Sequence, residues 1–435
     1  MSDLLRQALD GMAAANAGAN NPPWLQPRRE AARAKLGELS FPSTSQEEWR
    51  FTNIAPLLQL PLHVAAANGR HISAPDLEPF RFAGSHVLVF VDGRFREDLS
   101  SPPAKGAAWT ASSLQGRLAA GDAGLEKHLA RHASFDANFF TALNTAFFYD
   151  GAFISVPAGA VMDQPVQLLF VAASERPGAT VQARNLILAE ANSELKLIET
   201  YVSLTSLPHV TNTVTEVFLG PQARLEHCLL QNENQGAFHI AAVQAVQCRG
   251  SHWVSHSIAT GAQIARNQIQ TLLLEEGAEA ILNGLYLAQG EQLIDHHTVV
   301  DHAAPHCESH EFYHGILTDR SHGVFNGKIF VRPAAQKTNA KQTNRNLVLS
   351  ENAVIDTKPQ LEIFADDVKC THGATVGQLN DEALFYLRSR GIGAAQARRM
   401  LIRAFAADVV ERISIEPVRQ QLEQLLTDRF QKVEA

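Results

Sequence analysis

Cysteine is scarce in this sequence. Its 435 residues contain four cysteines, with no Cys-x-x-Cys pair: Cys228, Cys248, Cys307 and Cys370. A disulfide framework needs several closely spaced cysteines and a zinc ribbon needs Cys-x-x-Cys pairs, so both are disfavoured. Reduced, isolated thiols are typical of the cytoplasm.

Long hydrophobic runs are also missing. No segment approaches the roughly 18 uninterrupted apolar residues that a membrane helix needs. The composition, 45% hydrophobic and 19% charged, is that of an ordinary soluble protein. The first residues, MSDLLRQALDGMAAANAG, show no signal-peptide, twin-arginine or transit pattern. We therefore expect a cytoplasmic protein with no membrane partner.

The sequence has no concentrated positive charge. Its formal net charge is −8, and its lysines and arginines are scattered without interleaved aromatic residues. A nucleic-acid-binding surface needs clustered cations to neutralise phosphates. We therefore expect no nucleic-acid partner.

Common catalytic motifs are absent as well. The segment GVFNGKI, residues 323–329, has the wrong spacing for a P-loop and ends in isoleucine, so the chain is not expected to be an ATPase. No GxSxG, HExxH or strand-to-helix GxGxxG motif occurs. Asp366 and Asp367 are adjacent and would face opposite sides of a strand, which is weak evidence for a sugar-cleaving pair. A β-helix carbohydrate enzyme therefore stays open only as an alternative.

The first 150 residues read as a mostly helical region. Helical spacing runs from the start to about Leu60, with a break at Asn20–Pro23, and again from Ser112 to about Phe148. Between them, His86–Phe95 alternates around Asp92-Gly93, which predicts a hairpin.

Residues 151–378 have a different pattern, with short Val/Ile/Leu/Thr-rich runs separated by turns. Their spacing, mostly about 13 to 18 residues, favours a parallel β-solenoid over a β-sandwich or barrel. We expect Leu285 and Ile329 to point into its core. Turns are predicted near Asn192, Ser206, Gly220, Asn234, Gly250, Gly261, Gly277, Gly290, Pro305, Arg320, Ala334 and Asn352.

Residues 379–435 read as helices again. Asn380 is a good N-cap ahead of two acidic residues, and Pro417 opens a last helix. The middle helix carries an apolar stripe that must be buried against the end of the solenoid or against another protein. This stripe includes Met400, Leu401, Phe405 and Val409.

Histidines crowd the segment DHHTVVDHAAPHCESHEFYHG. A mononuclear metal site is one interpretation, because imidazole and thiolate suit zinc or iron. In a strand, however, side chains four residues apart lie about 13 Å from one another, too far for one ion. We expect no dedicated metal site here, and an autonomous metal-storage function stays an alternative. The candidates are His296, His297, His302, His306, Cys307, His310 and His314.

Cys370 and His372 form a second candidate site. Residues i and i+2 of a strand point to the same face, so the thiol and the imidazole would stand side by side. They could share a metal, or the imidazole could lower the thiol pKa. Two ligands are too few for a complete site, and a buried structural cysteine near a satisfied histidine is the other interpretation.

Several long motifs resemble the SufB/SufD family. They are DHHTVVDHAAPHCESHEFYHGIL, VFNGKIFVRPAAQKTNAKQTNRNLVLS and IDTKPQLEIFADDVKCTHGATVGQLNDEALFYLRSRGI, with ALNTAFFYDGAFISVPAG and EEWRFTN nearer the N-terminus. The Cys-x-His of DDVKCTHGATVGQL is similar to the D branch of the family rather than the B branch. The Asn/Ala-rich segment AANAGANNPP and the histidine-rich middle depart from the family pattern.

The resemblance implies a non-catalytic scaffold subunit for iron–sulfur cluster assembly. The implied fold is a right-handed parallel β-helix between helical ends. The implied partners are SufB, paired edge to edge, and the SufC ATPase, held by the C-terminal helices with Met400, Leu401, Phe405 and Val409. A homodimer could replace the SufB pair. The resemblance places Cys370 and His372 at the SufB contact as possible transient iron ligands, with no cofactor held tightly by the isolated chain.

Overall fold

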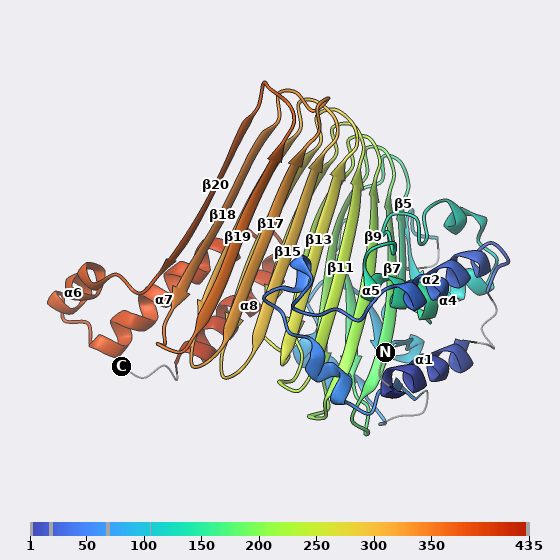
Figure 1. Cartoon of the computed structure of the whole chain (residues 1–435), viewed down its shortest axis with the longest axis horizontal. Helices are drawn as coiled ribbons and strands as arrows, with labels where there is room; N and C mark the ends of the chain where they lie inside the picture. Colours follow the sequence, from blue (N-terminus) through green and yellow to red (C-terminus); the bar gives the residue numbers. More distant parts are fainter. Residues whose placement is uncertain (1–2, 17–20, 67–69, 105, 432–435) are drawn as a thin grey trace.

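The computed structural model describes residues 3–16, 21–66, 70–104 and 106–431. Its centre is a β-solenoid in which the chain alternates between two sheets, so that from β5 onward odd-numbered and even-numbered strands stack separately (Figure 1). One sheet, in chain order, contains β1 (His63–Val64), β4 (Thr110–Ser113), β5 (Ala152–Val156), β7 (Ala179–Ala189), β9 (His209–Leu219), β11 (Phe238–Gln247), β13 (Ile264–Leu273), β15 (Leu293–His302), β17 (His322–Val331) and β19 (Val354–Ile363). The other contains β2 (His86–Val91), β3 (Arg94–Phe95), β6 (Val166–Ala172), β8 (Glu194–Ser203), β10 (Arg224–Asn232), β12 (His252–Ala259), β14 (Glu279–Ala288), β16 (Glu308–Leu317), β18 (Asn339–Val348) and β20 (Lys369–Gly377).

The solenoid confirms the fold class expected from the turn spacing. From β5 onward, each strand pairs in parallel with the strand two positions later in the chain, as β16 does with β18. All twelve predicted turn positions lie outside strands. Asn192, Gly250, Gly277 and Gly290 have positive φ there, a backbone conformation that glycine and asparagine tolerate best.

The interior between the sheets is filled by alternate side chains of every coil. Ile329 lies there, fully buried beside Val331 and Ala340, as predicted. The prediction for Leu285 was wrong. Leu285 is buried, but it packs with the C-terminal helices on the outer face of β14. A residue in a strand with apolar neighbours on both faces cannot be assigned to one face from its hydrophobicity.

The N-terminal part mixes helices and short strands. Its helices are α1 (Asp3–Asn16), α2 (Gln26–Glu38), α3 (Ala74–Leu77), α4 (Leu114–Ala119) and α5 (Phe139–Phe147), with 3-10 turns η1 (Glu47–Trp49), η2 (Ala55–Gln59), η3 (Glu78–Phe80), η4 (Glu97–Leu99) and η5 (Ala123–Lys127). The predicted hairpin is confirmed, because β2 and β3 pair antiparallel around Asp92-Gly93.

Two of the helical predictions for this part were too long. Ser112 and Ser113 belong to β4, which pairs antiparallel with β5, and only 3-10 turns follow α2 up to Leu60. Residues 21–23 of the predicted break are non-helical, while Asn20, like residues 17–19 of the Asn/Ala-rich segment, lies outside the described residues.

Two buried carboxylates of the solenoid fix the N-terminal part to it through hydrogen bonds. The carboxylate of Glu216 on β9 accepts hydrogen bonds from the backbone N–H groups of Ala130, His132 and Ala133 and pairs with Arg184 at 2.8 Å. Asp295 on β15 likewise accepts a hydrogen bond from Thr52 at 2.5 Å. The outer face of β20 is exposed, whereas β19 is half-buried and its Lys358 pairs with Glu47 of η1 at 2.7 Å.

Three helices follow the solenoid: α6 (Asp381–Ser389), α7 (Ala394–Val410) and α8 (Glu416–Phe430). Helices α7 and α8 cover the outer face of the even-numbered sheet, where they share one apolar cluster with strands β8 to β18. Helix α6 projects away from the solenoid (Figure 1) and contains no buried residue. Among the described residues, no helix is long and apolar enough to cross a membrane.

Candidate functional site

The two predicted ligands stand together on the last strand of the solenoid. Cys370 and His372 occupy β20, the terminal strand of its sheet (Figure 1). Their i, i+2 spacing puts both on one face, which is the inward face because Cys370 pairs with the interior residue Ala340. Cys370 is half-buried against the apolar interior formed by Ile329, Val331 and Ala340. His372 is exposed. One thiol and one imidazole are therefore presented at the open end, which we define as the coil formed by β19 and β20.

The thiol at this site is not activated by its neighbour. Partial burial raises the pKa of Cys370 above its ordinary value, against a smaller opposing effect of a backbone hydrogen bond from Ala340. The alternative in which the imidazole lowers the thiol pKa is therefore wrong for the isolated chain. Cys370 is therefore a neutral thiol at neutral pH.

The open end exposes two unpaired edges. In the described part of the chain, no strand pairs with the outer side of β19 or β20. Side chains on both strands are mostly exposed or half-buried, whereas the preceding coils are buried on at least one face. Unpaired N–H and C=O groups at a sheet edge are a ready template for another strand.

The histidine-rich segment is spread over both faces of the solenoid. His296 lies in the interior and bonds Ser257 at 3.0 Å, while its neighbour His297 lies on the outer face beside Asp295. His302 is interior and bonds Ser309, and burial lowers the pKa of His296 and of His302 to about 4.

The remaining members of the segment are equally dispersed. His306 occupies a turn with φ 57°, His310 is half-exposed, and Cys307 is buried. His314 packs against Phe405 of α7. A search of the described ranges finds no group of three His, Cys, Asp or Glu residues placed to hold a metal ion.

The predicted SufC-binding stripe is divided between two surfaces. Val409 is fully buried against the solenoid, and the ring of Phe405 stacks on His314 with 4.2 Å between centroids. Leu401 is half-buried, and Met400 is 43% exposed. Much of the stripe therefore attaches α7 to the solenoid, and of its four members Met400 is the one best placed to meet another protein.

Helix α6 carries two exposed aromatic residues that the sequence reasoning did not select. Phe385 is 74% exposed and Tyr386 is 58% exposed. The motif DEALFYLRS contained the signal, because adjacent apolar residues at the start of a short helix cannot all face one core.

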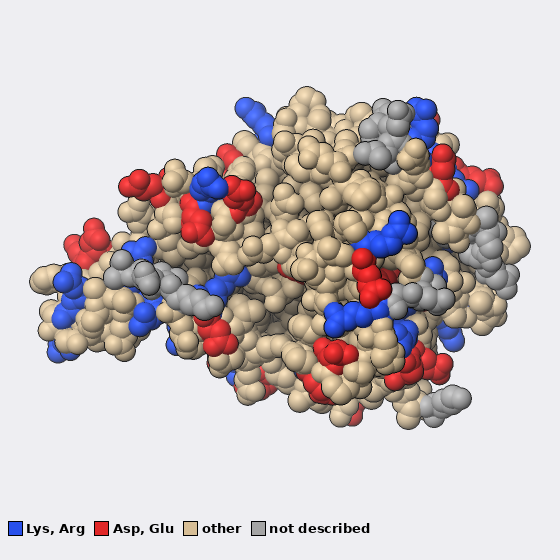
Figure 2. All heavy atoms as spheres, turned by 90° about the horizontal axis from the view of Figure 1, so that it is seen from below, with Lys and Arg blue, Asp and Glu red and all other residues tan. Residues whose placement is uncertain are grey.

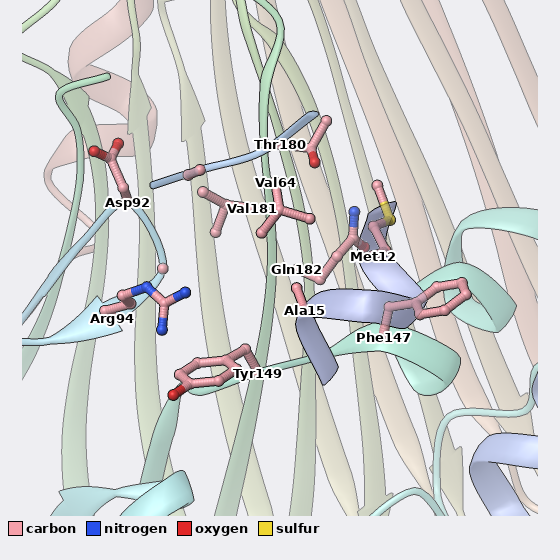
Figure 3. A pocket seen from close by; sticks show the side chains of 12 residues that line it. Met12, Ala15, Val64, Asp92, Arg94, Phe147, Tyr149, Thr180, Val181 and Gln182 are labelled. Carbon is pink, nitrogen blue, oxygen red and sulfur yellow. The ribbon is translucent and has the colours of Figure 1, made fainter. Parts of the chain in front are cut away.

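Several hollows lie away from the open end, including a cavity of about 580 Å³ between α8 and strands β8, β10 and β12. The cavity in Figure 3, where Arg94 lies over the Tyr149 ring, has a volume of about 30 Å³, room for roughly one water. It lies at the N-terminal end of the solenoid. On the face shown in Figure 2, acidic and basic side chains occur in small mixed groups.

Comparisons with known proteins all find members of one family. Residues 170–405 match the family model described as SUF system FeS cluster assembly, SufBD core domain, and residues 12–168 match the SufBD protein N-terminal region. The chain is 33% identical to the iron–sulfur cluster assembly SufBD family protein slr0076 of Synechocystis, over 92% of this chain and 90% of the relative. It is 32% identical to the iron–sulfur cluster assembly protein SufD of Escherichia coli, over 91% of each chain. It is also similar to the chloroplastic protein ABCI7 of Arabidopsis thaliana, with 29% identity over 96% of this chain and 88% of the relative.

Proposed function

Because this chain belongs to the SufB/SufD family of iron–sulfur cluster assembly proteins, we propose that it is the D-type scaffold subunit of a SufB–SufC–SufD complex. In this role it pairs with SufB through the open end of its solenoid and anchors the SufC ATPase through its C-terminal helices. It catalyses no reaction alone, works in the cytoplasm, and shares a transient iron ion or iron–sulfur cluster with SufB.

One observation supports this proposal most strongly: Cys370 and His372 share a face at the unpaired edge of the solenoid. Iron in a cluster is generally bound by four ligands, and this chain offers two here. A partner at the same edge can supply further protein ligands, and sulfide can bridge. An interior site would not be accessible to a second subunit.

The surface of the C-terminal helices supports the second partner. Met400 on α7 and Phe385 and Tyr386 on α6 expose large side chains, and α6 projects away from the solenoid. Exposed apolar side chains of this size on a helical projection are typical of a protein interface. Without SufB, the same open edges could pair two copies of this chain.

The test of the ligand assignment is cluster assembly in the reconstituted complex. We expect His372→Ala to leave the composition of the complex unchanged and to reduce the rate and yield of cluster assembly about tenfold or more, because it removes the exposed imidazole ligand. Cys370→Ala should have a smaller effect, since its thiol is protonated at neutral pH. The readout is cluster absorbance and acid-labile sulfide.

His310→Ala is the matched control, because His310 is a half-exposed histidine on the outer face of β16. A complex with the His310→Ala variant should assemble clusters at the wild-type rate. If the double variant at Cys370 and His372 also assembles clusters at the wild-type rate, both residues are structural and the cluster site lies within SufB.

A further inference from the structure

Three consecutive coils align a row of polar side chains inside the solenoid, ending at the open end. Glu311 on β16, Gln342 on β18 and His372 on β20 are register partners in neighbouring strands. Parallel strands lie about 4.8 Å apart, so each of these side chains stacks directly on the next. Glu311 and Gln342 are both almost fully buried, and His372 ends the row.

Glu311 fixes one end of the Gln342 amide. Gln342 donates a hydrogen bond from Nε2 to Oε1 of Glu311 at 3.1 Å, and Thr298 donates to the other carboxylate oxygen. Because Nε2 donates to Glu311, the other polar atom of the Gln342 amide, Oε1, remains available as an acceptor. It is buried and accepts no hydrogen bond from the described residues.

The opposite sheet leaves room for this arrangement. A Cβ on Gly327 of β17 would come within 2.3 Å of Nε2 of Gln342, so the amide occupies space that only a glycine leaves free. Gly327 belongs to the GVFNGKI segment, which has no phosphate-binding role. Glu311 and Gly327 thus hold the Gln342 amide in one place, with an unsatisfied acceptor on the register partner of His372.

We propose that Gln342 is a positioning residue for His372: the imidazole, which is exposed and makes no hydrogen bond to Gln342 in this structure, turns inward and donates its N–H to the side-chain oxygen. An acceptor at one ring nitrogen fixes the tautomer, so that the other nitrogen presents its lone pair to a metal. Ligating histidines are generally oriented by such a partner. The role of this hydrogen bond in cluster assembly rests on the proposed function, but its formation does not require iron.

The tautomer of His372 provides the test. Full-length chain labelled with ¹⁵N-histidine is compared at about pH 8.5, where histidine side chains are ordinarily neutral, and the His372 signals are identified with His372→Ala. In wild type, one tautomer should dominate. Gln342→Leu removes the acceptor and should give both tautomers, whereas Gln342→Glu keeps an oxygen acceptor and should restore one.

Gln360→Leu is the control, because Gln360 lies on the outer face of β19 and bonds Asn326 instead. It should leave the His372 signals unchanged. A wild-type mixture of tautomers, or signals that do not respond to Gln342→Leu in a folded chain, would overturn the proposal.

Cluster assembly then separates this inference from the proposed function. Gln342→Leu should slow assembly in the complex about tenfold, the usual effect of removing such a partner, and Gln342→Glu should recover most of the rate. An unchanged rate in Gln342→Leu would overturn the positioning role. An unchanged rate in His372→Ala would instead overturn the proposed function, whatever the tautomer shows.

Discussion

Glu311 is a carboxyl group kept in the interior without a cation to pair with. Burial raises its pKa to about 7, and its hydrogen bonds from Thr298 and Gln342 only partly oppose this rise. The folded chain therefore holds a proton on Glu311 that the unfolded chain releases near pH 4.5. Stability contributed by this group is present at pH below about 4.5 and is lost as pH rises toward 7.

Replacing Glu311 by glutamine should remove this pH dependence. Relative to wild type, Glu311→Gln should gain about 3 kcal/mol of unfolding free energy between pH 5 and pH 8, because the variant has no proton to lose. Urea unfolding of both chains at the two pH values measures the change.

Glu216→Gln should behave in the opposite way and serves as the control. Burial raises the Glu216 pKa, but Arg184 and backbone N–H groups outweigh burial and lower it overall. Its variant should lose stability relative to wild type as pH rises from 3 to 6. A Glu311→Gln difference that stays constant with pH would show that Glu311 is ionised in the folded chain at both pH values.

At the scale of single residues, local spacing predicted some positions and missed others. The i, i+2 rule placed Cys370 and His372 on one face, because it depends only on the strand between them. Gln342 was missed, because its position beneath His372 depends on the length of a whole coil. Leu285 was misplaced because both faces of its strand are covered.

At the scale of elements, α7 has one face packed on the solenoid and one face exposed to solvent. Val409 is fully buried, whereas Met400 on the same helix is 43% exposed. The sequence predicted the apolar stripe but could not decide what covers it, because a cap and a partner bury the same residue types.

Two variants of this helix should therefore separate stability from SufC binding. Met400→Ser should change the unfolding free energy by less than about 0.5 kcal/mol but weaken SufC binding, because it removes an exposed apolar contact. Val409→Ala should cost about 1–3 kcal/mol by leaving a cavity, yet bind SufC normally while folded. Calorimetric titration with SufC and thermal unfolding measure the two effects, and loss of SufC binding only in Val409→Ala would contradict this division.

At the scale of the whole molecule, the regular turns predicted the solenoid because each coil repeats the same local pattern. The N-terminal part has no repeat, and its predicted helices were too long where tertiary pairing drew Ser112 and Ser113 into β4. In the described part of the chain, no strand pairs with the outer edge of β20, although natural proteins generally protect such edges. The pairing with SufB proposed above would protect this edge.

Proline substitutions in β20 should distinguish its two sides. The Lys369 N–H donates to the carbonyl oxygen of Thr338, the residue directly before β18, and N–H groups of successive residues in a strand point to opposite sides. By this alternation, the Thr375 N–H faces β18 and the Ala374 N–H faces the open edge.

Ala374→Pro should keep the chain folded but weaken pairing with SufB, because it removes an outward donor and places a ring at the edge. Thr375→Pro should instead loosen β20 itself, because it removes a bond to β18. Hydrogen exchange of β20 amides reports the second effect, and analytical ultracentrifugation with SufB reports the first. Undiminished SufB pairing by Ala374→Pro would show that the partner does not bind through the backbone of this edge.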